Sequence, residues 1–143
     1  MKKLIYSILF CSLSFVSYSQ IKYDKDKTRI ISVCDQFMKN FRDGKLSDAM
    51  ELLKQNSVIA HSTIDTLQAT ISDQMKNVFP DFGKILSYEL ITEKKIKDFI
   101  AKRFYILKFE QYYLKFEFTL YHSATGWTIT KFIYNEDLTE LLL

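Results

Sequence analysis

The stretch LKFEFTLY, residues 114–121, decides the fold. Its residues alternate between two faces, with Leu114, Phe116, Phe118 and Leu120 on one and Lys115, Glu117, Thr119 and Tyr121 on the other. This alternation predicts a β-strand with one buried face and one wet face. Similar stretches rich in β-branched and aromatic residues predict four strands in all, over residues 85–93, 99–110, 112–122 and 127–134. Short polar segments between them are typical of turns between antiparallel neighbours.

Helical spacing dominates the chain before residue 80. Apolar residues at steps of three and four predict helices over residues 25–43 and 47–56, and Gly44 is placed to end the first of them. A brief strand is expected over residues 57–60, followed by a long helix that Pro80 closes.

Helices that precede an antiparallel sheet define the α+β class. No linker or internal repeat divides the chain, so we expect a single domain over residues 20–143. The tail, residues 135–143, carries four leucines and is expected to dock as a last helical turn.

The first 19 residues have the pattern of a secretory signal peptide. Lys2 and Lys3 precede an apolar run, and Ser17 and Ser19 supply small residues before a cleavage site at Gln20. The alternative is an uncleaved N-terminal anchor, but the run is shorter than the roughly 20 residues that a spanning helix needs, so cleavage is favoured. No membrane span is expected after cleavage. We therefore expect a periplasmic or secreted protein.

Composition excludes several classes of protein. The chain is 48% hydrophobic and 26% charged, which argues against a disordered or collagen-like chain. Cleavage would remove two lysines and no acid, leaving 18 basic and 17 acidic residues, too even a balance for a nucleic-acid binder. Cys34 would be the one remaining cysteine, on the apolar face of the first helix, so we expect a buried thiol and no internal disulfide.

The order of elements, together with the last strand, is similar to the NTF2-like, or cystatin-like, superfamily. Residues 126–132, GWTITKF, resemble the G-W-x-I-x-x-F last strand of secreted bacterial members. The resemblance implies a strongly curved antiparallel sheet wrapped around the helices, forming a cone with a pocket at its open end. It also implies a range of functions from isomerases, dehydratases and cyclases to binding modules, so the fold alone does not settle the function.

His61 and Asp65 are the candidates for catalysis. Four residues apart at the start of the long helix, the carboxylate could orient the imidazole as a general base. The alternative is that Asp65 interacts with the helix dipole, after a cap by Ser62 or Thr63, while His61 is exposed. His122, at a strand end, is expected to face solvent, and no metal site or cofactor is expected because no ligand spacing or glycine-rich loop is present.

Aromatic residues give the ligand-binding candidates. Tyr88, Tyr105 and Trp127 fall on the strand faces assigned inward, where they could stack on an apolar ligand or simply pack in the core. Tyrosines on the outer sheet face, Tyr112, Tyr113 and Tyr121, could instead form the interface of a homodimer.

Three functional hypotheses follow. The preferred one is a non-catalytic, exported NTF2-like module that binds a small apolar ligand or a protein partner. The second is an isomerase, dehydratase or cyclase that uses His61 and Asp65. The third is a structural dimer subunit of an envelope assembly.

Overall fold

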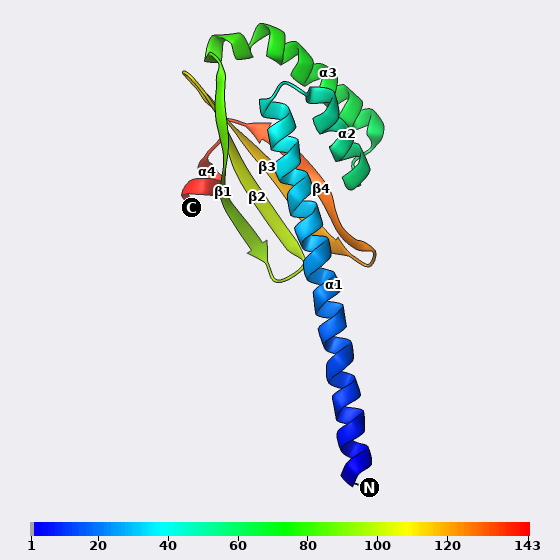
Figure 1. Ribbon diagram of the computed structural model, residues 1–143. Helices are drawn as coiled ribbons and strands as arrows, with labels where there is room; N and C mark the ends of the chain where they lie inside the picture. The colour runs from blue at the N-terminus through cyan, green and yellow to red at the C-terminus, as the bar shows by residue number, and fades with distance from the viewer. Residues whose placement is uncertain (1) are drawn as a thin grey trace.

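The computed structural model describes residues 2–143, with side chains from Lys22 onward (Figure 1). The predicted signal peptide, residues 1–19, lies outside the residues whose side chains are described and stays a prediction. In chain order the elements are α1 (Lys2–Arg42), α2 (Leu46–Asn56), α3 (His61–Asn77), a 3₁₀ helix η1 (Phe79–Phe82), β1 (Ile85–Ile96), β2 (Ile100–Phe109), β3 (Tyr113–Ser123), β4 (Gly126–Asn135) and α4 (Thr139–Leu142). The α+β class is confirmed.

The four strands form one curved antiparallel sheet in the order β1-β2-β3-β4, as the alternating stretches predicted. α1 crosses its inner face, and α2 and α3 lie at one end of the sheet (Figure 1). Phe37 and Phe41 of α1 meet the sheet edge-to-face, at 5.2 Å from the ring of Phe118 and 4.9 Å from that of Phe116. All four rings are buried, and each contributes roughly 2 kcal/mol or more of burial free energy.

The end of α1 agrees with the sequence. Gly44 has a φ of 76°, and its N–H bonds the carbonyl of Phe41 while that of Lys45 bonds the carbonyl of Asn40. These two bonds form a Schellman motif, whose left-handed position glycine occupies without steric cost.

Several boundaries in the helical half were predicted wrongly. α1 begins well before residue 25. The brief strand over residues 57–60 reduces to one bridge from Ser57 to Ile129. Because α3 already begins at His61, Ser62 and Thr63 lie inside it and no side chain caps it. Asp65 lies beyond its first turn.

The outer face of β3 was predicted to be wet, but it is exposed only toward the end of the strand, where Tyr121 is 42% exposed. Lys115 and Glu117 are only 3% and 4% exposed. Lys115 lies over the ring of Phe104, and Glu117 pairs with Lys102 at 3.1 Å. The tail contributes through Glu140 of α4, which also pairs with Lys102.

The C-terminal leucines do not all dock as expected. α4 confirms the predicted helical turn, but Leu142 and Leu143 are 81% and 95% exposed. The tail is attached through Glu140, which binds Lys102 and Lys94, and through Glu136, which accepts hydrogen bonds from Tyr112 and Tyr113, while its last two leucines are exposed to solvent.

Candidate functional site

A cluster of charged and hydroxyl groups lies where α1 meets the first two strands. Arg103 is 6% exposed and donates to Glu93 at 2.6 Å and to the hydroxyl of Tyr105 at 3.1 Å. The Tyr105 hydroxyl in turn donates to Asp35 of α1, and Lys27 pairs with Glu93 at 3.3 Å. The cluster thus links α1 to β1 and β2 through hydrogen bonds that satisfy its buried charge.

The protonation of the cluster follows from burial and charge. Burial and the hydrogen bond to Asp35 raise the pKa of Tyr105, so its phenol stays neutral. Burial would raise the pKa of Glu93, but hydrogen bonds from Arg103 and Lys27 outweigh it and lower that pKa. Burial raises the pKa of Cys34 to about 12, which confirms the expectation of a buried, neutral thiol.

The three aromatic ligand candidates do not converge on one place. Tyr88 and Tyr105 lie near each other, with ring centroids 6.4 Å apart, and Arg42 lies over the ring of Tyr88. Tyr105 is fully buried, and its ring also meets Phe118 edge-to-face. Trp127 begins β4, in a different aromatic group. The rings of Tyr105 and Trp127 are therefore surrounded by side chains of the chain itself.

Trp127 forms a corner with Tyr23 of α1 and His122 of β3. The ring centroid of Trp127 lies 5.7 Å from that of Tyr23 and 5.3 Å from that of His122, and Lys27 lies over the indole. His122 was expected to face solvent, but this packing leaves it only half-exposed. The indole N–H of Trp127 is buried and has no hydrogen-bond partner among the described residues.

His61 and Asp65 are not joined by any hydrogen bond in the described part of the chain. His61 is exposed at the start of α3, as the alternative interpretation expected. Asp65 pairs instead with Lys54 of α2, at 2.5 Å. The carboxylate therefore links two helices rather than orienting the imidazole.

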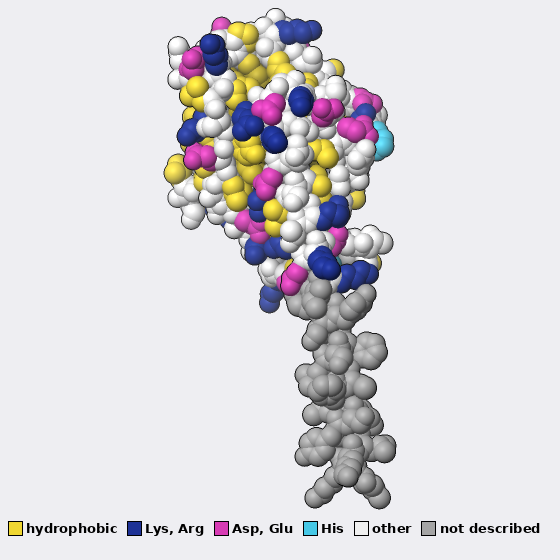
Figure 2. All heavy atoms as spheres, in the orientation of Figure 1, with side chains coloured by type: hydrophobic (Ala, Val, Ile, Leu, Met, Phe, Trp, Pro, Cys, Tyr) yellow, Lys and Arg dark blue, Asp and Glu magenta, His cyan; other side chains and the backbone are white. Residues whose placement is uncertain are grey.

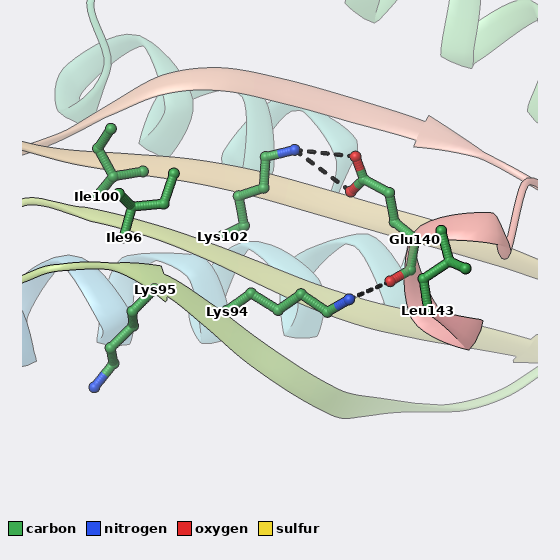
Figure 3. A pocket seen from close by; sticks show the side chains of 7 residues that line it. All are labelled: Lys94, Lys95, Ile96, Ile100, Lys102, Glu140 and Leu143. Carbon is green, nitrogen blue, oxygen red and sulfur yellow. Dashed lines mark hydrogen bonds and ion pairs between the residues drawn. The ribbon is translucent and has the colours of Figure 1, made fainter.

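A pocket of about 330 Å³ opens on the outer face of the sheet beside the tail (Figure 3). Its apolar side chains are Ile96, Ile100 and Leu143. Lys94 and Lys102 both point toward Glu140, Lys94 binding its carbonyl and Lys102 its carboxylate, while Lys95 points away (Figure 3). The two lysines that point toward the tail are thus already engaged by it.

The least expected feature is the open side of β1. This strand is at the edge of the sheet, yet it exposes large apolar side chains together with the turn that follows it. They are Leu86, Leu90, Ile91, Ile96 and Phe99, each 40% to 60% exposed. Hydrophobic side chains gather on the side of the molecule where β1 lies (Figure 2). Sequence reasoning missed this surface, since the apolar residues of β1 look like core residues until the neighbouring strands are known.

Among the residues that the structure describes, no three His, Cys, Asp or Glu side chains are grouped so as to hold a metal ion. No helix in this described part is both long and apolar enough to cross a membrane.

Comparisons with protein families, curated proteins and solved structures find no match to this chain.

Proposed function

We propose that this chain is an exported NTF2-like module that binds a protein partner along the edge strand β1. The order of the helices and of the antiparallel sheet supports the NTF2-like part of the proposal, and the N-terminal sequence supports export. The role is one of binding rather than catalysis, because Asp65 is engaged by Lys54 and the candidate aromatic rings are packed.

The observation that carries the proposal is the exposed apolar row on β1. Large exposed apolar patches on soluble proteins mark interaction sites. The row lies on a strand that has β2 on one side and, in the part of the chain that the structure describes, no strand on the other. An edge strand offers backbone N–H and C=O groups to an added strand, so main-chain hydrogen bonds and apolar side chains would act together.

A protein partner fits this surface better than a small ligand. Small-molecule sites are concave and bury most of the ligand. Leu86, Leu90 and Ile91 instead follow one another along a single extended strand. Such a row matches another extended chain.

A photo-crosslinking amino acid at Leu90, introduced in the native host, tests the proposal. We expect a crosslinked protein species from Leu90 that disappears when Ile91→Lys is added. The matched control is the same probe at Val58, which is 67% exposed but lies beside the opposite edge of the sheet. No crosslink at Leu90, or one that Ile91→Lys leaves unchanged, would overturn the proposal. A mature mass that begins at Gln20 would establish cleavage of the signal peptide.

A further inference from the structure

A β-bulge interrupts the open edge of β1. In its register with β2, Leu90 lies opposite Tyr105 and Thr92 lies opposite Phe104, so Ile91 has no opposite residue. An extra residue of this kind disturbs pairing with a regular strand and is one way in which edges are protected. Ile91 is nevertheless apolar and 47% exposed, whereas the residues that protect an edge strand are charged side chains or proline.

The bulge does not prevent pairing, because the regular strand β2 already pairs with β1 on both sides of Ile91. A partner at the open edge must likewise accommodate the extra residue to keep the two faces of the sheet in register. A second copy of β1, related by a two-fold axis between Ile91 and Thr92, carries the same extra residue at the opposing point. The two extra residues then compensate each other, and the register holds on both sides.

The faces of β1 agree with this two-fold arrangement. Opposite residues in an antiparallel pair lie on the same face of the sheet. The register with β2 places Glu89 and Lys94 on the outer face, since they oppose Ile106 and Lys102. Around the axis, Glu89 of one copy opposes Lys94 of the other.

The inner face pairs in the same way. Tyr88 and Lys95 oppose Leu107 and Ala101 of β2 and so share the inner face. Around the axis, Tyr88 of one copy opposes Lys95 of the other, which allows a cation–π contact.

Charge and burial favour the same arrangement. Opposite charges that face each other across two strands stabilise the pair, and the symmetry supplies the Glu89–Lys94 contact twice. Glu89 pairs with Lys108 at 3.1 Å and Lys94 binds the carbonyl of Glu140, but Glu89 is 60% exposed at its side chain and Lys94 is exposed. Pairing across the axis would therefore exchange exposed contacts within one chain for contacts between the two copies. Ile91 and Leu90 lie beside the axis, where pairing would cover them.

We infer that β1 pairs antiparallel with β1 of a second copy over residues 87–96, which joins two four-stranded sheets into one. This inference rests on the proposed function and names the partner as the chain itself. It differs from a dimer formed through Tyr112, Tyr113 and Tyr121 on the outer face, because here the contact is at the edge of the sheet.

Sedimentation equilibrium of the purified protein tests the inference through charge reversal. Glu89→Lys and Lys94→Glu each place like charges opposite one another twice in a dimer, so each should raise the dimer dissociation constant roughly tenfold. The double variant restores opposite charges and should return the constant to within about threefold of the unmodified protein. A monomer at all concentrations, or a dimer insensitive to both single changes, would overturn the inference.

Cysteine crosslinking gives a second measurement that does not depend on charge. Cysteine at Ile91 lies beside the axis and should form a disulfide between copies on mild oxidation. Cysteine at Leu86 should not, because the two copies of that residue would lie about 36 Å apart along the paired strands. Cys34 is buried and should not react in either variant. Crosslinking at Leu86 but not at Ile91 would contradict the register.

The two proposals fail in different ways. If the Leu90 photo-crosslink joins the chain to a different protein and sedimentation shows a monomer, β1 is a binding edge but not a self-association edge. If no crosslink forms and the protein is a monomer, both proposals are wrong.

Discussion

The two edges of the sheet are treated differently by the rest of the chain. Along β4, the N–H of Val58 bonds the carbonyl of Ile129, Arg29 bonds the carbonyl of Trp127, and Asp26 accepts the N–H of Trp127. Along β1, Glu93 binds Arg103 and Lys27 on the inner face, and Lys94 binds the carbonyl of Glu140 on the outer face. The β4 edge is therefore covered by α1 and the α2–α3 connection, while the β1 edge is held through its two faces and its backbone is left open.

The difference between the two edges indicates which region stabilises the fold and which region is available for binding. Closing an edge satisfies its backbone groups and prevents unwanted strand addition. Fixing a strand from its inner face gives stability without covering its backbone. The comparison therefore predicts large stability losses for changes at the β4 corner and inside the cluster, and small ones on the open side of β1.

The largest effect is expected at the closed edge. Trp127→Ala removes a nearly fully buried indole and should lower the free energy of unfolding by about 4 kcal/mol, measured by urea denaturation. Trp127→Phe is the matched control, because it keeps a ring while removing an indole N–H that has no partner among the described residues. It should cost much less than the alanine change. Equal losses for the two variants would contradict the packing of the corner.

The second effect concerns the cluster behind β1. Arg103→Met keeps much of the side-chain volume but leaves the carboxylates of Glu93 and Asp35 without their shared cation. We expect a loss of about 3 kcal/mol in the free energy of unfolding, since breaking a buried ion pair from one side leaves an uncompensated charge.

A double variant, Arg103→Met with Glu93→Gln, controls for that charge. It removes the charge on both sides of the strongest pair and should recover part of the loss. If the double variant is no more stable than Arg103→Met, the loss does not come from the unpaired Glu93.

A smaller effect should appear where the α2–α3 connection meets β4. Val58→Pro removes the N–H that bonds Ile129, at an exposed position where little else changes, and should cost about 1 kcal/mol. Val58→Ala keeps the N–H and should be nearly neutral. Hydrogen exchange at the amides of β4 would show whether the proline opens this edge selectively.

The sequence allowed the sheet to be predicted more fully than the site. The alternation in residues 114–121 correctly predicted strand β3 and its buried side, and Gly44 correctly predicted the end of α1. Both signals are local patterns in the sequence. The burial of Lys115 and Glu117 could not be predicted, since it depends on partners in β2 and on the distant tail. That Asp65 pairs with a residue other than His61 could not be predicted for the same reason. Lys54, which takes the carboxylate, lies on another helix.

Lowering the pH should weaken the ion pairs that attach β1, and this is the smallest of the predicted effects on stability. The pKa of Glu93 is lowered in the folded protein, so its contribution to stability is present above its unfolded pKa, near 4.5, and is lost as the pH falls through the lower folded value. As the pH falls below about 4.5, protonation of Glu93 should therefore lower the free energy of unfolding by less than about 1 kcal/mol, in addition to the effect of the other groups. Glu93→Gln should abolish that part of the drop, whereas Glu89→Gln, on the exposed face of the same strand, should preserve it. A Glu93→Gln profile as steep as that of the unmodified protein would mean that the inner-face ion pairs do not hold β1, and that the edge is kept in place by its pairing with β2 alone.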